Sequence, residues 1–211
     1  VLEKMNLFID PSDPDLSEEN IIHAYQTAER IRLDQPENKE LQVIGLIHDV
    51  GKILFDFNYP DWSIVGDTFV TGCEYPKSLV YYNYAEKTKE CQKYKGNKLG
   101  IYSLNCGLKN LNITLGHDEY LYQVLKQNKE KHNLSEESLN IIRFHSFYPW
   151  HTYDEYKYFM DKEDYKTLEN IKKFNTYDLY SKEDKEFKVT SEMKTYYRNL
   201  INIFFKENIT W

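Results

Sequence analysis

Long apolar runs, cysteine pairs, glycine and proline are all scarce in this chain of 211 residues. No window approaches the roughly 18 uninterrupted apolar residues of a membrane-spanning helix, so we expect no membrane partner. The three cysteines, Cys73, Cys91 and Cys106, form neither a CxxC pair nor an even disulfide framework. They predict reduced thiols and an intracellular, cytoplasmic protein. Residues 1–4 also lack the basic and apolar regions of a signal peptide.

Basic residues are in the minority as well. The chain has 27 Lys and Arg against 34 Asp and Glu, which gives a formal net charge of -7. Nucleic acids and anionic membranes select clustered Lys and Arg, so we expect neither as the main partner. A hydrophobic content of 41% with 29% charged residues predicts a folded globular chain and excludes a disordered one.

The shortage of turn-forming residues favours helices. The alternating apolar and polar residues that are typical of strands are nearly absent. Ser135 is placed to cap a helix, and Pro149 follows the end of the same helix. We expect a single all-α domain over residues 1–211, with a loop at 60–72 and a polar surface excursion at 87–100. The predicted helices span residues 17–34, 38–57, 117–131, 135–147, 161–180 and 191–207.

Adjacent His48 and Asp49 lie inside the most apolar of these helices. An ionised aspartate in a core helix is costly unless it is paired or bound to a metal. One interpretation is therefore a metal site. The other is that Asp49 caps a neighbouring helix while His48 bonds a backbone carbonyl.

Other polar residues with apolar neighbours favour the metal site. Each alone is more often a buried side chain with ordinary hydrogen-bond partners, but four histidines out of six share this context. His132 lies in a Lys-rich run and is predicted to be exposed, whereas His151 could lie behind the site or on the surface. The further candidate ligands are His23, His117, His145 and Asp178.

The order His, His-Asp, Asp is the pattern of the HD metal-binding superfamily, whose members hold a metal within a helical bundle. Here it corresponds to His23, His48, Asp49 and Asp178. The two remaining histidines allow a second metal, with Asp49 as the bridge. A ligand set of histidines and carboxylates without thiolate suits iron or manganese better than structural zinc.

The sequence resembles the myo-inositol oxygenase family from Asp10 to Trp211. The His-Asp-x-Gly-Lys string alone is a weak signal, because HD phosphodiesterases share it. The long segment at 143–151 makes the resemblance specific. The segments that carry it are SDPD at 12–15, HAYQTAE at 23–29, GLIHDVGK at 45–52, VGDTF at 65–69, GHDEY at 116–120, RFHSFYPWH at 143–151, Phe174-Asn175 and DLY at 178–180.

The resemblance implies an HD-type helical bundle and a mixed-valent diiron site that cleaves the ring of myo-inositol with O2 to give D-glucuronate. It implies one iron held by His23, His48, Asp49 and Asp178, and a second held by Asp49, His117 and His145. Substrate contacts would come from Asp10, Pro11, Ser12, Lys52, Gly66, Asp67, His145 and Ser146. Pro11 stands where the family usually has an acidic residue. No GxGxxG motif or P-loop signals a nucleotide cofactor.

Lys52 is the candidate catalytic residue. In a continuous helix it would share a face with His48, one turn away. Its ammonium could stabilise an alkoxide that develops on the substrate. The alternative interpretation is a surface lysine whose stem alone packs against the protein.

The resemblance also raises expectations about the remainder of the chain. Family members carry a segment before this region that closes over the substrate as a lid, and we expect that lid to be absent from these 211 residues. Residues 83–97 match the family poorly and predict a variable loop. We expect a monomer whose partners are the small-molecule substrate and O2.

Two other functions remain compatible with the sequence. One is a metal-dependent phosphohydrolase on the same fold, with Lys52 contacting phosphate. Few basic residues beyond Lys52 and Arg143 lie near the candidate site, which argues against it. The other is an inactive inositol- or protein-binding module that has kept the fold.

Overall fold

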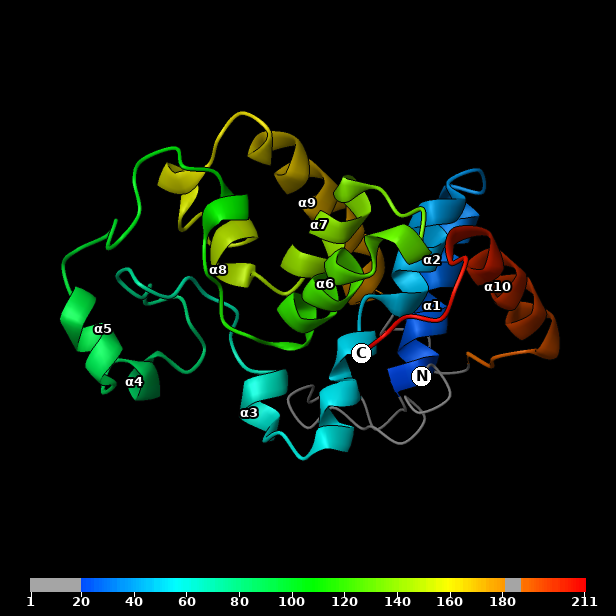
Figure 1. Cartoon of the computed structure of the whole chain (residues 1–211), viewed down its shortest axis with the longest axis horizontal. Coiled ribbons are helices and arrows are strands. Elements are labelled where there is room, and N and C mark those ends of the chain that lie inside the picture. Colours follow the sequence, from blue (N-terminus) through cyan, green and yellow to red (C-terminus); the bar gives the residue numbers. More distant parts are fainter. Residues whose placement is uncertain (1–19, 181–186) are drawn as a thin grey trace.

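In the computed structural model, which describes residues 20–180 and 187–211, the chain folds into helices joined by loops (Figure 1). Within these residues no strand forms, and two isolated bridges join Val70 to Ile113 and His132 to Phe205. The all-α prediction is confirmed. The longer helices are α1 (Asn20–Asp34), α2 (Lys39–Ile47), α6 (His117–Gln127), α7 (Glu136–Phe144), α9 (Asp164–Tyr180) and α10 (Ser191–Phe204).

Five of these helices surround one hydrophobic core. Helix α1 packs along α2 and α9, while α7 contacts α2, α6 and α9. Helix α10 covers the outer side of α2 at one end of the molecule (Figure 1). Gly45 of α2 permits the closest approach of α1, since a Cβ there would lie 3.1 Å from the Ala28 Cα atom. This contact sets the distance between the elements that carry His23 and His48.

The predicted helix over residues 38–57 is interrupted in its middle, so that expectation is wrong. Helix α2 ends at Ile47, and Asp49 adopts φ -91° and ψ 0°, in the sparsely populated bridge region. The chain continues as a 3-10 helix, η2 (Val50–Phe57). The bend lets the backbone of Gly51 pack on α6, where a Cβ would lie only 1.9 Å from the His117 carbonyl oxygen.

The other predicted helices are present but shorter than predicted. Ser135 caps α7 by accepting a hydrogen bond from the Ser138 N–H, as expected. The last turn of the predicted helix 117–131 is separate, as η4 (Lys129–Lys131) after α6, and a short helix that was not predicted, α8 (Tyr148–His151), follows α7. The predicted loop at 60–72 contains a single helical turn, α3 (Asp61–Ile64).

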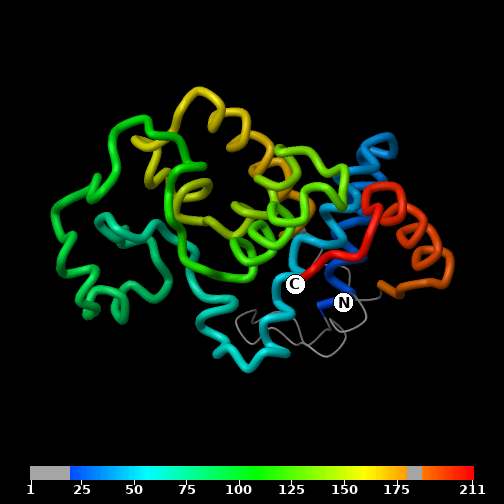
Figure 2. The backbone as a smooth tube through the Cα atoms, viewed as in Figure 1, coloured from blue at the N-terminus to red at the C-terminus, as the bar shows by residue number. Residues whose placement is uncertain are grey.

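A long excursion between α3 and α6 leaves the helical core and projects from the opposite end to α10 (Figure 2). It carries the short helices α4 (Tyr82–Ala85) and α5 (Lys89–Tyr94), with η3 (Leu108–Asn110) on its return. The predicted polar excursion at 87–100 falls within it. Its one buried side chain in that range, Cys91, packs with Tyr75 and Leu79 in a small separate apolar cluster.

His132 is buried, so the prediction of a surface residue is wrong. Its Nε2 atom lies 3.0 Å from the Leu125 carbonyl, and its Nδ1 accepts from the Leu134 N–H. The lysines around it point outward while the imidazole turns in and joins two backbone segments. The last 3-10 turn, η5 (Lys157–Phe159), precedes α9. None of the helices in the described part of the chain is long and apolar enough to cross a bilayer.

Replacing Gly45 by valine tests the contact between α1 and α2. The new side chain would press on Ala28 and on the Ile31 methyl group, which a Cβ already approaches to 2.7 Å. We expect the free energy of unfolding to fall by about 1–3 kcal/mol, measured by urea denaturation. Leu33→Val places the same branched side chain at an exposed position of α1 and should have little effect. Equal stability of the two variants would contradict the close contact.

Candidate metal centre

Six histidine and aspartate side chains converge in the interior of the helical core. None is more than 7% exposed to solvent. They come from α1, from the junction between α2 and η2, from the start of α6, from the end of α7 and from α9. They are His23, His48, Asp49, His117, His145 and Asp178, the candidate ligands that the sequence predicts.

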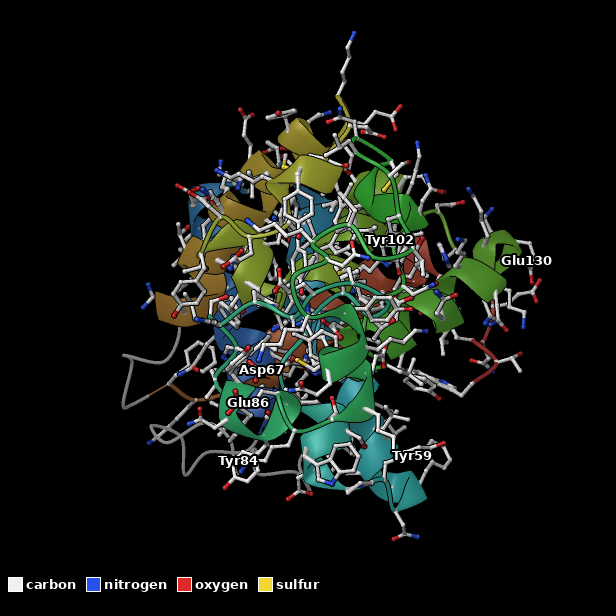
Figure 3. All side chains as sticks on the ribbon, turned by 90° about the vertical axis from the view of Figure 1, so that its left-hand side faces the viewer. Tyr59, Asp67, Tyr84, Glu86, Tyr102 and Glu130 are labelled. Atoms are coloured by element: carbon white, nitrogen blue, oxygen red, sulfur yellow. The ribbon has the colours of Figure 1, made fainter. Side chains whose placement is uncertain are left out.

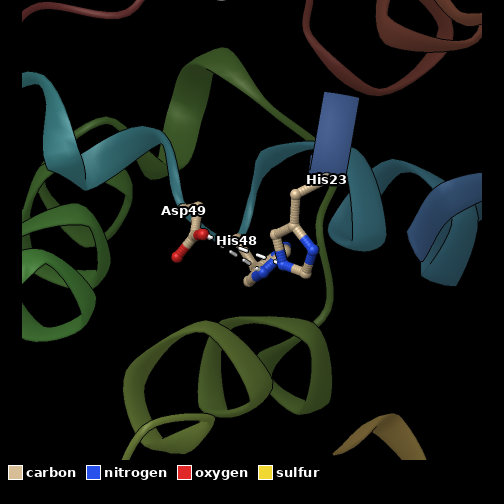
Figure 4. Close-up of side chains that lie close together, drawn as sticks. All are labelled: His23, His48 and Asp49. Atoms are coloured by element: carbon tan, nitrogen blue, oxygen red, sulfur yellow. Dashed lines mark ion pairs between the residues drawn. The ribbon is translucent and has the colours of Figure 1, made fainter. Parts of the chain in front are cut away.

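One group of these side chains lies between α1, α2 and α9. His23, His48 and Asp49 place one donor atom each within 4.8 Å of one another, and Figure 4 shows them side by side. The Oδ1 atom of Asp178 lies 2.8 Å from His23 Nε2 and 3.3 Å from His48 Nε2. Asp49 Oδ2 lies 4.0 Å and 3.7 Å from the same two nitrogens.

A second group shares Asp49 with the first. The other oxygen of this carboxylate, Oδ1, lies 3.3 Å from His117 Nε2 and 3.6 Å from His145 Nε2. These three residues again place their donor atoms within 4.8 Å of one another. Asp49 therefore presents one oxygen to each group, which is the geometry of a carboxylate that bridges two cations.

Backbone carbonyls fix the orientation of three of the imidazoles. The Nδ1 atom of His48 lies 2.9 Å from Gly45 O, that of His117 2.8 Å from Ile64 O, and that of His145 2.8 Å from Ile142 O. A carbonyl only accepts, so each Nδ1 carries the proton and each Nε2 offers a lone pair to the cluster. Metal-binding histidines are commonly held in this way.

The two histidines of the second group show that the cluster suits a cation. His117 Nε2 and His145 Nε2 lie 3.2 Å apart, and the carbonyls on their Nδ1 atoms leave both with lone pairs that face each other. Two facing lone pairs repel unless a proton or a metal ion lies between them. The donor set therefore fits a divalent transition metal.

The charges around the cluster also favour a bound cation. Burial favours the neutral form of Asp49, but the charges of the Lys52 ammonium and the His48 ring, together with the nearby His117 and His145 rings, hold its pKa well below its ordinary value. Burial opposes ionisation of Asp178 too, yet His48 and His23 keep its pKa low. Burial lowers the pKa of His48, and the charges of Asp49 and Asp178 more than reverse this effect. Two buried carboxylates thus stay ionised and attract cations.

Lys52 lies over Asp49 instead of sharing a face with His48, so the predicted position is wrong in detail. In a 3-10 helix residues three apart are eclipsed, and Asp49 and Lys52 are three apart. The Lys52 Nζ atom lies 2.9 Å from Asp49 Oδ2 and 3.4 Å from the Asn20 side-chain oxygen. Only 7% of the residue is exposed, so the surface-lysine interpretation is excluded.

The remaining predicted substrate contacts have different surroundings. Asp10, Pro11 and Ser12 lie outside the described residues, as does the predicted first turn at 17–19. Gly66 and Asp67 form the half-buried loop after α3, and a Cβ on Gly66 would lie 2.2 Å from the Trp62 carbonyl.

The carboxylate of Asp67 accepts hydrogen bonds from the backbone N–H groups of Val80 and Tyr81, at 3.0 Å and 2.9 Å. These bonds hold the start of the excursion against the loop. Figure 3 shows Asp67 near α4, on the same side of the molecule as the labelled Tyr84 of that helix and Glu86, which follows it.

Two further polar residues are buried near the cluster, and the first has no role among the predicted site residues. Asp118, which follows His117, is fully buried and accepts hydrogen bonds from Thr68 and from Ser146. Only its position directly after a candidate ligand could have drawn attention to it. His151, left open by the sequence, is buried and lies 3.0 Å through Nε2 from the His145 carbonyl. Burial lowers its pKa to about 4.

Comparison with known proteins identifies the family. The sequence profile described as myo-inositol oxygenase matches residues 1–211. The chain belongs to the myo-inositol oxygenase family. Among its relatives, inositol oxygenase 1 of Arabidopsis thaliana is 43% identical, and the match covers 99% of this chain and 68% of the relative. The inositol oxygenases of Danio rerio and Sus scrofa are 39% and 38% identical, covering all of this chain and 75% and 76% of their own lengths.

Membership of the myo-inositol oxygenase family agrees with the resemblance of the motifs. It also gives a reason for the interruption at Asp49. The bridge-region backbone of Asp49 aims its carboxylate at both groups of histidines, and the 3-10 helix that follows places Lys52 directly over it.

Replacing Gly51 by alanine tests whether its contact with α6 positions His117. The added Cβ would lie 1.9 Å from the His117 carbonyl oxygen, so the backbone of one segment must shift. We expect the variant to lose metal binding at the second group, with the content falling from two metals per chain to about one. Elemental analysis after iron loading measures this content.

Gly96→Ala is the matched control for Gly51→Ala. Unlike Gly51, Gly96 has a positive φ of 76°, and nothing lies within 4 Å of its added Cβ. It should cost about 1 kcal/mol of backbone strain without changing the metal content. Two metals bound by Gly51→Ala with unaltered affinity would show that the contact does not position His117.

Proposed function

We propose that this chain cleaves the ring of myo-inositol with O2 to give D-glucuronate, at a site that binds two iron ions. The observation that carries the proposal is the shared Asp49 carboxylate, which faces two groups of buried histidines in a member of the myo-inositol oxygenase family. Each relative described above is named an inositol oxygenase.

The proposed ligand sets follow the two groups. His23, His48, Asp49 and Asp178 would hold one ion, and Asp49, His117 and His145 the other. Bound iron supplies a Lewis acid for adjacent hydroxyl groups of the substrate and a redox partner for O2. The ring of Phe174 packs against His48 and His145, with centroids 5.4 Å and 6.5 Å away, and keeps water from that side of the cluster.

Lys52 is the proposed catalytic residue. Its ammonium is held beside Asp49 in a buried position, where a charge acts more strongly than in water. From there it would favour negative charge on a substrate hydroxyl oxygen and so assist removal of the hydroxyl proton. The carboxylate of Asp49 keeps the ammonium charged and limits the orientations of the long side chain.

The phosphohydrolase alternative is not favoured. Arg143 donates to Glu119 through Nε at 2.6 Å and through Nη2 at 3.4 Å, and both side chains are buried. Its charge is thus neutralised inside the protein, and Nη2 also bonds the Leu111 carbonyl. Of the two basic residues that the sequence placed near the site, only Lys52 remains for a phosphate.

The defining test uses purified chain loaded with iron. Oxygen consumption and glucuronate formation from myo-inositol are measured together, with an anaerobic sample as control. We expect glucuronate only in the presence of O2. Hydrolysis of a phosphate ester without O2, or no product from inositol under any condition, would contradict the proposed function.

Replacing Lys52 by alanine separates a catalytic role from metal binding. We expect kcat to fall by about 100- to 1000-fold, as for the loss of one electrostatic stabilising group. Iron content should be unchanged, because removing a cation beside Asp49 does not weaken metal binding. Lys109→Ala, which removes a lysine from a surface ion pair with Glu163, is the control and should keep full activity. A parallel loss of iron and activity in Lys52→Ala would identify a structural role.

A further inference from the structure

Two hydroxyl side chains from separate segments meet at the fully buried carboxylate of Asp118, next to the candidate metal centre. Asp118 Oδ2 accepts a hydrogen bond from Thr68 Oγ1 at 2.9 Å and from Ser146 Oγ at 2.5 Å. The two hydroxyl oxygens lie 3.2 Å from each other. Asp118 and Thr68 are buried, while Ser146 remains partly exposed. We call Thr68, Asp118 and Ser146 the hydroxyl triad.

The hydroxyl triad adjoins each part of the proposed site. Asp118 follows His117, Ser146 follows His145, and Thr68 follows the Gly66–Asp67 loop. The fold makes room for the carboxylate at Gly116, where a Cβ would lie 2.9 Å from Asp118 Oδ1. The triad therefore joins the loop after α3 to the two segments that carry the histidines of the second group.

The count of donors and acceptors fixes the role of the Ser146 hydroxyl. A hydroxyl has one proton to donate and two lone pairs. Both triad hydroxyls donate their proton to Asp118 Oδ2, and Asp118 Oδ1 accepts from the Glu119 N–H at 2.7 Å. The partly exposed Ser146 oxygen is left with lone pairs alone. It can accept a hydrogen bond from a ligand and cannot donate one.

We propose that Asp118 is a positioning residue for the substrate, which makes Ser146 an obligate hydrogen-bond acceptor for a hydroxyl group of the polyol. The proposal rests on the proposed function, because it takes inositol as the ligand. Asp118 acts through Ser146 and Thr68 and does not itself touch the substrate. Its charge also strengthens the acceptor, since a hydroxyl that donates to a carboxylate is polarised toward its oxygen.

The substitution Asp118→Asn tests the proposal without changing the size of the side chain. The carboxylate accepts at both oxygens, but an amide accepts at one and donates at the other. If the amide oxygen still accepts the hydrogen bond from the Glu119 N–H, the amide nitrogen faces Ser146 and donates to its oxygen. The Ser146 hydroxyl proton then turns toward the substrate. We expect the dissociation constant and KM for myo-inositol to rise about 10- to 100-fold, the effect of losing one charge-assisted hydrogen bond. The value of kcat and the iron content should change little.

Two further variants complete the experiment. Ser146→Ala should raise KM by a similar factor, and combining it with Asp118→Asn should add little, because both act on one hydrogen bond. Asp164→Asn is the matched control: it alters a buried carboxylate that accepts from the Leu108 N–H. It lies 14 residues before Asp178 on α9, about 21 Å along the helix. It should lower the melting temperature and leave KM unchanged.

Anaerobic calorimetry of myo-inositol binding to the iron-loaded variants, beside steady-state kinetics and iron analysis, decides between the outcomes. Wild-type activity with an unchanged KM in Asp118→Asn would overturn the role of Asp118 and leave the proposed function intact. A loss of iron in proportion to activity would overturn it too, because the triad would then serve only to place the histidines. Additive effects of Asp118→Asn and Ser146→Ala would exclude a shared hydrogen bond. Absence of inositol binding and glucuronate in the wild type would overturn both proposals.

Discussion

The buried charge of Asp49 is the constraint on which the rest of the structure depends. An ionised carboxylate in a protein interior is stable only with cations or donors around it. Here the Lys52 ammonium lies 2.9 Å from one oxygen, and histidine rings face both oxygens. The fold supplies these partners from α1, from η2, from the start of α6 and from the ends of α2 and α7, so the cluster depends on the packing of the core. This explains why candidate ligands occupy positions that apolar side chains would otherwise fill.

Close backbone contacts deliver these partners to Asp49. Gly45 lets α1 approach α2, which brings His23 to His48, and Gly51 lets η2 approach the start of α6, which brings His117 to Asp49. Neither glycine has a positive φ, so each is required by space and not by backbone conformation. The rigidity that results suits a site whose nitrogen and oxygen atoms must keep distances of a few ångströms without relying on flexible loops.

Much of the helical architecture and the convergence of the candidate ligands could be predicted from the sequence, because both leave local signals. Apolar periodicity marks a helix wherever it packs on a core. A histidine between apolar neighbours, such as His23 or His145, must be buried with a partner. The same logic failed for His132, whose lysine neighbours point to solvent while the ring turns inward. Neighbouring residues indicate the exposure of a segment, but the direction of one side chain depends on tertiary contacts.

The features that the sequence could not reveal depend on pairs of residues far apart in the chain. The 3-10 geometry after Asp49 satisfies the contact between Gly51 and His117, and no local propensity in that apolar segment indicates it. Thr68 lies 50 residues before Asp118, and Ser146 lies 28 residues after it. A hydroxyl or a carboxylate gives no periodic signal of its own. The residues that orient a site are therefore harder to predict than its candidate ligands, although the position of each candidate ligand depends on such contacts.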